Sequence, residues 1–426
     1  MPTIPDHPLR YALTNELHAR PFPTLAAPGR AAYLALKPPK AATARDRDAE
    51  RTHLIALLDR FGAPHPQPGA THWSGQIGRH FLKWESHTEF VTFTVFAEGT
   101  ADIPFDPTAF DVFPEDWLAE APGARIASAL IRVELQEGDE EIDDKANAWF
   151  VRDSLAISRM LDDNLVVATD FRIDPAGHTR FALFARPGTG ERRIGRVVQR
   201  LCEIETYKTM SMLGLARARE LAPELNALEQ RLTDLVDHMG DESVSPAETL
   251  NALLKVSAGL ESIAAQSSYR FSATNAYEAI VNQRIEVLRE TRFKGRQTFA
   301  EFMSRRFDPS MRTVKSTEQR LRTLIERAVR ASDLLRTRVD VELSEENQKL
   351  LSSMDQRAHL QLRLQQTVEG LSVVAISYHA LNLVLYLFGP AEELWHIKKY
   401  WIAAGATPVV VFVVWLMIRR IRKSMH

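Results

Sequence analysis

Two long apolar runs stand out in the pattern of hydrophobic and polar residues near the C-terminus. Residues 370–390 and residues 400–418 contain no Lys, Arg, Asp or Glu. Each run is long enough to cross a bilayer as a helix, which takes about 20 residues. The segment between them, AEELWHIKK, is short and polar. The pattern therefore predicts a transmembrane helical hairpin, followed by a short tail over residues 419–426.

The distribution of charge predicts the orientation of this hairpin. Basic residues favour the cytoplasmic side of a membrane, and the tail carries Arg419, Arg420, Arg422 and Lys423. The N-terminus has no cationic start followed by an apolar core, so it does not resemble a secretory signal. We expect both ends of the chain on the cytoplasmic side, with the residues before the hairpin forming a cytosolic body.

The first apolar run has small and polar residues on one side only. At about 100° per residue these positions share one arc of a helix. They are Ser372, Ala375, His379, Asn382, Tyr386 and, at the edge of the arc, Gly389. Such groups are costly against lipid and usually face a bundle interior or a water-filled path. The alternative is that they hydrogen-bond across a helix pair. The second run is nearly all aliphatic and is predicted to face lipid.

The middle of the chain, residues 191–369, has a helical pattern. Helices are expected over residues 192–221, 222–239, 246–268, 273–307 and from 309 onward, with breaks at prolines. Apolar residues recur at steps of three and four, at Leu321, Ile325, Ala328, Leu335, Val339, Leu350 and Met354. This spacing predicts a helical bundle or coiled coil. The last helix is expected to continue into the membrane, or else to break near Asp340, and to pack against neighbouring protomers.

The first part, residues 1–190, alternates between helical and strand patterns. Strands are expected over residues 30–36, 79–84, 89–96, 125–135, 164–171 and 180–185, and helices over 11–18, 44–61 and 146–161. This order predicts a mixed α/β or α+β cytosolic domain with a sheet of about five to seven strands.

Composition excludes several classes of protein. The 53 Lys and Arg residues nearly balance the 55 Asp and Glu residues, so there is no global basic field for binding nucleic acid. The single cysteine, Cys202, excludes an intrachain disulfide and most thiolate metal sites. Its helical setting favours a buried structural thiol in a reducing compartment.

Two polar clusters are candidates for an active site. Glu16, His18 and Arg20, with His7 and Arg10 before them, combine a general base with groups that bind anions, and His80, His87 and Glu89 form a second cluster. Neither has the histidine spacing of a zinc protease, and the chain has no phosphate loop or nucleophile elbow. The sequence therefore does not predict an enzyme or a cofactor.

An acidic run is the one candidate for a metal site. It contains Asp139, Glu140, Glu141, Asp143 and Asp144. Clustered carboxylates can hold a hard divalent cation such as magnesium. The alternatives are a solvated loop, or carboxylates placed at the positive N-terminus of the following helix.

Several segments together resemble a family of uncharacterised bacterial membrane-anchored proteins. They are NELHARPF, WESHTEFVTF, ATDFRIDPAGHTRF, QRLCEIETYKTMSMLGLARARE and LQQTVEGLSVVAISY. The resemblance covers nearly the whole chain. It implies a multi-pass protein of the bacterial inner membrane but brings no known activity.

The order of the parts also resembles the CorA-type magnesium transporters. A cytosolic α/β domain, a long helix leading into the first of two C-terminal membrane helices, and a basic tail are common to both. This resemblance implies a pentamer whose first membrane helices line the pore. The Gly-Met-Asn sequence of that group is absent, and Leu387, Phe388, Gly389 and Pro390 stand in its place.

These observations support two main hypotheses for the function. The first is a homo-oligomeric ion channel or transporter, with the small and polar arc of the first membrane helix along the path. The second is a membrane-anchored scaffold or sensor that binds a protein partner through its helical bundle. An enzyme acting near lipid, with Glu16, His18 and Arg20 as its groups, is a third.

Overall fold

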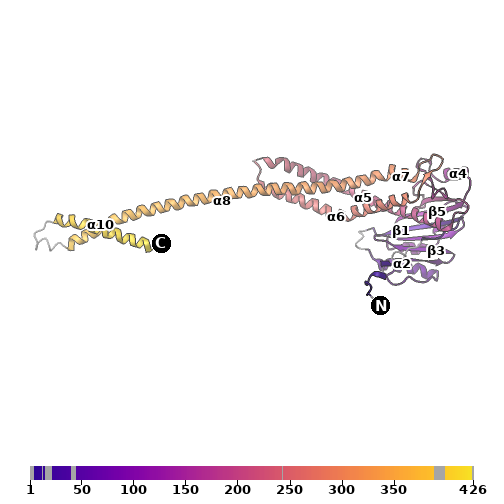
Figure 1. Ribbon diagram of the computed structural model, residues 1–426, viewed down its shortest axis with the longest axis horizontal. Helices are drawn as coiled ribbons and strands as arrows, with labels where there is room; N and C mark the ends of the chain where they lie inside the picture. The colour runs from indigo at the N-terminus through magenta and orange to yellow at the C-terminus, as the bar shows by residue number, and fades with distance from the viewer. Residues whose placement is uncertain are drawn as a thin grey trace. The chain divides into compact units, whose positions relative to one another are not determined.

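The computed structural model describes residues 4–11, 13–14, 22–39, 45–241, 243–387 and 399–424. Contacts divide the chain into two compact units. The first contains Met1–Gly240 and Asn251–Ala331, and the second contains Asp241–Leu250 and Ser332–His426. The elements of both are labelled in Figure 1.

A mixed sheet is the centre of the first unit. Within the described residues it has nine strands in the order β2-β3-β4-β1-β5-β8-β7-β6-β9. Only β5 and β8 pair in parallel. The strands are β1 (Gly29–Lys37), β2 (His72–Ile77), β3 (His80–Ser86), β4 (Val91–Glu98), β5 (Ala124–Leu135), β6 (Ala156–Met160), β7 (Leu165–Thr169), β8 (Thr179–Ala185) and β9 (Thr291–Arg292). The predicted α+β class is confirmed.

Most of the remaining described elements are helices. The α-helices are α2 (Arg47–Arg60), α3 (Glu115–Ala119), α4 (Asp139–Trp149), α5 (Glu191–Asp237), α6 (Pro246–Glu286), α7 (Phe299–Arg306), α8 (Asp308–Leu387) and α10 (Lys399–Ser424). Three short 3-10 helices are η2 (Pro107–Phe110), η3 (Arg152–Ser154) and η4 (His238–Gly240). The 80 residues of α8 form one helix with no break at Asp340.

Helices cover both faces of the sheet. On one face, Leu54 of α2 and Trp117 of α3 share a buried cluster with Leu34 of β1. Ile142 of α4 packs into a second cluster on the sheet. Successive residues of a strand point to opposite faces, and Tyr33, the neighbour of Leu34, hydrogen-bonds to Thr206 of α5 at 2.5 Å. The sheet therefore lies between α2, α3 and α4 on one side and α5 on the other.

The long helices of the first unit pack as a bundle, as predicted. Arg320 of α8 donates a hydrogen bond to Asn226 of α5 at 2.7 Å, and Lys315 of α8 donates to Glu278 of α6 at 2.8 Å. At Gly214, α5 and α6 approach so closely that a Cβ atom would clash with the side chain of Thr274. These contacts hold residues 308–331 of α8 against α5 and α6.

Four expected helix boundaries were wrong. The helix expected over residues 273–307 is interrupted after Glu286, where β9 and then α7 follow. Pro223 lies inside α5, because the buried Leu221 and Leu225 on either side pack into the bundle and packing outweighs the hydrogen bond that a proline removes. The expected break between residues 268 and 273 is absent from α6. The helix expected over residues 146–161 ends at Trp149, and a strand, β6, follows it.

A buried histidine packs between α2 and α3. The ring of His53 stacks on Trp117 with centroids 3.9 Å apart, and the indole of Trp117 donates to the His53 carbonyl at 2.8 Å. His53 is 7% exposed. Burial, together with the positive charge of Arg60, lowers the pKa of His53 from 6.5 to about 4. The folded chain therefore holds this ring in its neutral form.

This pKa predicts a loss of stability in weak acid. The unfolded chain binds a proton at His53 below pH 6.5 and the folded chain does so only below about pH 4, so stability falls as the pH drops through this window. The shift corresponds to about 3 kcal/mol at its acid end. We expect His53→Phe, which keeps a ring on Trp117, to flatten the pH dependence of the thermal unfolding midpoint. Substitution of the exposed His7 by Gln should leave the pH dependence unchanged, and equal slopes for wild type and His53→Phe would contradict the assignment.

Candidate functional site

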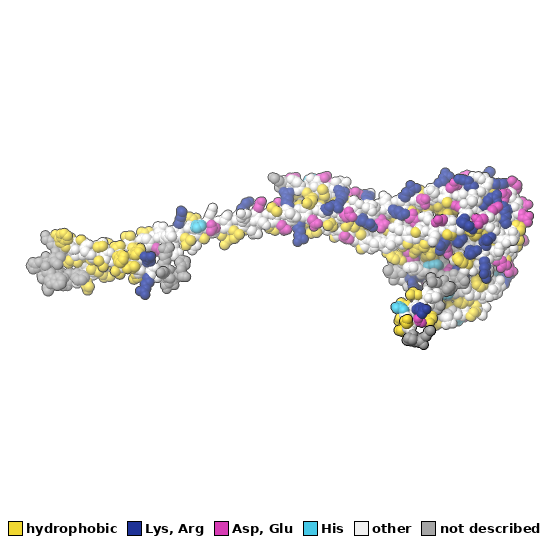
Figure 2. All heavy atoms as spheres, in the orientation of Figure 1, with side chains coloured by type: hydrophobic (Ala, Val, Ile, Leu, Met, Phe, Trp, Pro, Cys, Tyr) yellow, Lys and Arg dark blue, Asp and Glu magenta, His cyan; other side chains and the backbone are white. Residues whose placement is uncertain are grey.

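The two apolar runs form exposed helices in the second unit. The described residues include two helices long and apolar enough to cross a membrane, Asp308–Leu387 and Tyr400–Arg420, and only 6% of the most apolar window of each is buried. Figure 2 shows hydrophobic side chains gathered over α10 and the adjoining end of α8. Neither run is the core helix of the folded unit, because a core helix would be mostly buried.

The small and polar arc lies on an uncovered side of α8. His379 and Ala375 are exposed, Tyr386 is 80% exposed, and Ser372 and Asn382 are partly exposed. Ser377, which lies about 180° around the helix from the middle of the arc, is 6% exposed. The covered side of α8 is therefore the side opposite the arc.

Two hydroxyl groups of the apolar helices are satisfied within their own helix, whereas the buried hydroxyl of Ser377 has no recorded partner. Ser372 donates to the carbonyl of Val368 at 2.7 Å, and Thr407 donates to the carbonyl of Ala403 at 2.7 Å. This back-bonding lets a hydroxyl sit in an apolar surrounding without an outside partner. The ring of His379 contacts Tyr378, with centroids 5.8 Å apart.

An apolar seam precedes the arc on the same face of α8. The seam consists of five exposed residues, Leu343, Leu350, Met354, Leu364 and Val368. At about 100° per residue the seam and the arc share one side of the helix. Glu346, Arg357 and Gln361 interrupt the seam. Leu350 and Met354 were predicted from the sequence spacing. The other three were not, although their spacing continues the same pattern.

The basic tail is only partly described. Arg419 lies over the ring of Trp415, with its guanidinium carbon 5.1 Å from the ring centroid. Arg420 is exposed, and the backbone of Arg422 and Lys423 continues α10. Gly389 lies outside the described residues.

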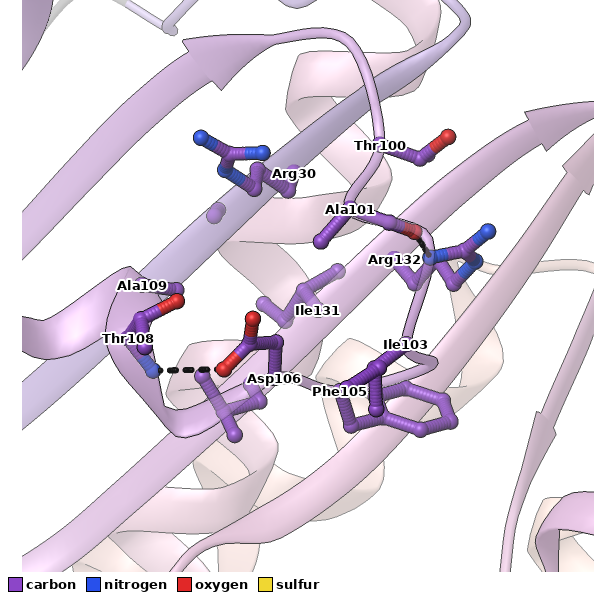
Figure 3. Close-up of a pocket in the computed structure, with 12 residues that line it drawn as sticks. Arg30, Thr100, Ala101, Ile103, Phe105, Asp106, Thr108, Ala109, Ile131 and Arg132 are labelled. Carbon is purple, nitrogen blue, oxygen red and sulfur yellow. Dashed lines mark hydrogen bonds between the residues drawn. The ribbon is translucent and has the colours of Figure 1, made fainter.

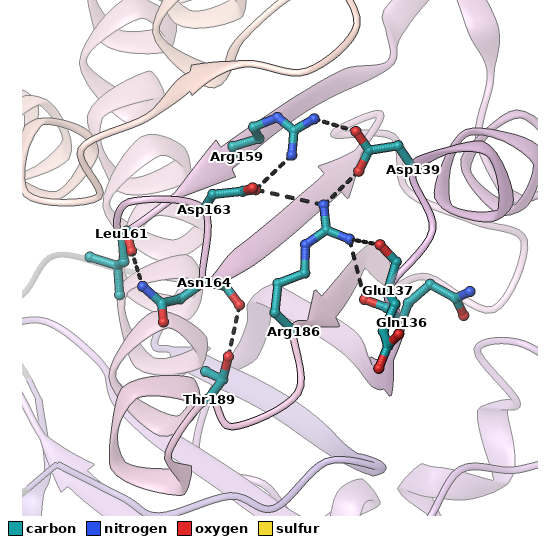
Figure 4. A network of polar contacts seen from close by, with 9 residues as sticks. All are labelled: Gln136, Glu137, Asp139, Arg159, Leu161, Asp163, Asn164, Arg186 and Thr189. Carbon is teal, nitrogen blue, oxygen red and sulfur yellow. Dashed lines mark hydrogen bonds and ion pairs between the residues drawn. The ribbon is translucent and has the colours of Figure 1, made fainter.

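The acidic run is helical and is paired with basic residues. It begins α4, and Asp139 lies between Arg159 and Arg186 in the network of Figure 4, 2.5 Å from Arg186. Elsewhere in the run, Glu140 pairs with Lys294 at 2.5 Å and Asp143 with Arg296 at 2.8 Å. Glu141 and Asp144 are exposed. No group of three or more His, Cys, Asp or Glu in the described parts of the chain could hold a metal ion, so the structure does not gather these carboxylates into the metal site that the sequence suggested.

The first polar cluster is only partly described. Glu16, His18 and Arg20 lie outside the described residues, while Arg10 forms an ion pair with Asp6. Cys202 is buried, and burial raises the pKa of its thiol. A raised pKa disfavours the thiolate that a nucleophile needs, which agrees with a structural role.

Glu89 joins the sheet domain to α6. Its carboxylate is fully buried and accepts from Arg270 at 2.5 Å and from the Tyr277 hydroxyl at 2.8 Å. Burial and this bond to Glu89 raise the pKa of Tyr277, so its hydroxyl remains a donor. His87 does not take part in these bonds. Its ring stacks on Phe90, with centroids 4.5 Å apart.

Comparison with known proteins gave one family match. A model of the family described as "Protein of unknown function (DUF3422)" matches residues 5–425. No curated protein matches the sequence.

The buried Glu89 pair predicts a strong effect of a small substitution. Glu89→Gln keeps the shape but leaves the Arg270 charge without its counter-charge. Breaking a buried pair in this way costs about 3 kcal/mol, which corresponds to a fall in the thermal midpoint of roughly 6–12 °C. Glu224→Gln, at an exposed carboxylate of α5, is the matched control and should change the midpoint by little. If the thermal midpoint of Glu89→Gln equals that of the control, the pair of Glu89 and Arg270 does not stabilise the fold.

Proposed function

Because the chain belongs to the DUF3422 family, whose description assigns no function, we propose a function from the geometry of its own residues. We propose that the protein is a homo-oligomeric membrane protein in which α8 lines an ion path. The observation that carries the proposal is the single face of α8 on which an apolar seam is followed by a small and polar arc.

The first step is insertion in a bilayer. Leu371, Val374 and Leu387 are each more than 65% exposed on α8, and each such side chain gains about 1.5–3 kcal/mol when it leaves water. Contiguous apolar surface of this extent is typical of a membrane or partner contact. Insertion of both runs, with Arg419 and Arg420 on the cytoplasmic side, gives a two-span protein with both ends in the cytoplasm. We propose the bacterial inner membrane as its location.

The second step is association of several copies through α8. In water, a helix interface is apolar, as the seam is. In lipid, the surrounding tails are themselves apolar, and helix interfaces are instead enriched in small and polar residues, as the arc is. An interface that continues from water into lipid should therefore change from apolar to small and polar residues along one face of the helix. The seam and the arc of α8 have this order. Arg357 and Gln361 within the seam fit the polar positions that fix register in such assemblies.

The third step is the path itself. A closed ring of copies would turn one arc per protomer toward a common axis, so that rings of His379, Asn382 and Tyr386 line it. Imidazole, amide and phenol groups can replace part of the hydration shell of an ion, as pore-lining dipoles do. The resemblance to CorA-type transporters supports a pentamer and a divalent cation such as magnesium.

The oligomer step is tested with paired leucines on two faces of α8. Leu350→Lys with Leu364→Lys places charge in the seam. Leu351→Lys with Leu362→Lys places it about 100–120° from the centre of the seam, on leucines of similar exposure. We expect the seam variant to weaken association at least tenfold in mass photometry of nanodisc samples and the second variant to assemble as the wild type does. A monomeric wild type, or equal losses in both variants, would exclude the seam as an interface.

The path step is tested by flux into proteoliposomes loaded with a magnesium-sensitive dye. We expect His379→Leu and Asn382→Leu to change the flux at least several-fold while the oligomer stays intact, because they remove polar groups from the path. Val374→Leu, on an exposed position away from the arc, should leave the flux unchanged. Loss of assembly in the His379 and Asn382 variants would show instead that the arc is packing contact, and no flux in the wild type would favour the membrane-anchored scaffold.

A further inference from the structure

A second site lies in the sheet domain, where three basic residues meet across neighbouring strands. Arg30 of β1 pairs with Ala97 of β4, and Phe81 of β3 pairs with Phe96 of β4. His80, one residue before Phe81, therefore continues the row from Arg30 through Ala97. Paired residues share one face of a sheet, and the small alanine between them leaves space. Arg79 completes the group from the turn between β2 and β3.

Two cavities at this end of the strands share the three basic residues. The larger has a volume of about 470 Å³ and is also lined by Phe81, Glu98 and Glu191. The smaller has a volume of about 320 Å³ and is also lined by Phe61 and Asp111. A small ligand typically occupies roughly 300–1,000 Å³. The larger cavity is therefore wide enough for a small molecule with an anionic group.

Arg30 and Arg79 lack the counter-charges that other arginines of this domain have. Among the residues with described positions, neither guanidinium forms an ion pair, and the one recorded side-chain bond is from Arg79 to His80. Arg132, which pairs with Arg30 across β1 and β5, instead contacts Glu134 at 2.6 Å and the Ala101 carbonyl at 2.6 Å. Figure 3 shows this contrast, with a hydrogen bond at Arg132 and none at Arg30.

His80 adds a donor that has no acceptor. Arg79 Nε donates to His80 Nε2 at 3.3 Å, and a guanidinium can only donate, so the neutral ring carries its proton on Nδ1. That atom is buried and has no hydrogen-bond partner in the described structure. Burial and the charges of Arg79 and Arg30 lower the pKa of His80, which favours the neutral ring.

We propose that Arg30, Arg79 and His80 bind the phosphate group of a small phosphorylated molecule. Guanidinium groups match phosphate oxygens in pairs of hydrogen bonds, and two of them balance a doubly charged group. Phe81 and Phe96 supply an apolar wall for the body of the molecule, and Glu98 and Glu191 accept hydrogen bonds from its hydroxyl or amino groups. The proposal concerns the sheet domain alone and does not depend on the ion path.

Isothermal titration of the full-length protein in phosphatidylcholine nanodiscs tests the site, with sodium pyrophosphate as the probe at fixed ionic strength. We expect saturable binding at one site per chain, weakened at least tenfold by Arg30→Gln and by Arg79→Gln. Arg219→Gln, which removes an exposed arginine of α5 outside both cavities, should bind as the wild type does. Citrate, a carboxylate anion of comparable charge, is the second titrant.

Each outcome decides the proposal. No saturable heat with the wild type, or equal weakening by Arg219→Gln, would overturn the site. Tighter binding of citrate than of pyrophosphate would overturn the assignment to phosphate. Arg30→Gln relieves repulsion between like charges, so its thermal midpoint should not fall. If Arg30→Gln fails to fold, Arg79→Gln and His80→Gln are titrated with pyrophosphate in its place. Unchanged binding in both variants would overturn the site.

Discussion

The structure depends on the unbroken backbone hydrogen bonding of α8. Within a helix every interior backbone group is satisfied by the helix itself, so a helix can pass from water into lipid without exposing unpaired polar atoms. The side chains alone then decide what each segment contacts. Residues 308–331 belong to the bundle of the first unit, and the seam and the arc follow in the second. A proline or a stable turn near Asp340 would separate these segments and remove the single face on which the proposed assembly depends.

Local sequence patterns predicted the elements whose signal lies in side-chain spacing. The strands β1, β3, β4, β5, β7 and β8 are short runs rich in apolar residues, and α8 has no proline after Pro309, so both kinds of element followed from the sequence. Elsewhere, tertiary contacts outweighed the local signal. Pro223 is tolerated because Leu221 and Leu225 are buried in the bundle. β2 has the sequence HWSGQI, whose glycine and polar residues blur the alternation, and only pairing with β3 makes it a strand.

The same distinction between local spacing and tertiary contacts applies to the candidate sites. The arc was predictable because its residues are neighbours on one helix. The acidic run was not interpretable in isolation, because Arg159, Arg186 and Arg296, which pair with it, come from distant parts of the sequence. The cluster of Arg30 with His80 was equally hidden. It follows from strand register, and register is set by pairing across the whole sheet rather than by any local motif.

The charged side chains of this domain fall into two groups, those with a partner of opposite charge and those without a recorded ion pair. Glu89 is enclosed by Arg270 and Tyr277, and Asp139 by two arginines, so their desolvation is offset within the protein. The half-buried Arg30 and the exposed Arg79 line the same two cavities. Neither forms an ion pair among the described residues, and His80 beside them leaves a polar atom unpaired. An unpaired buried polar atom alone costs about 1–3 kcal/mol. Other buried polar atoms of the domain, among them His53 Nε2 and Trp84 Nε1, also have no recorded partner. The unpaired atom of His80 differs from these because it lies beside two arginines that line the same cavities. A phosphate group would supply acceptors to all three side chains at once.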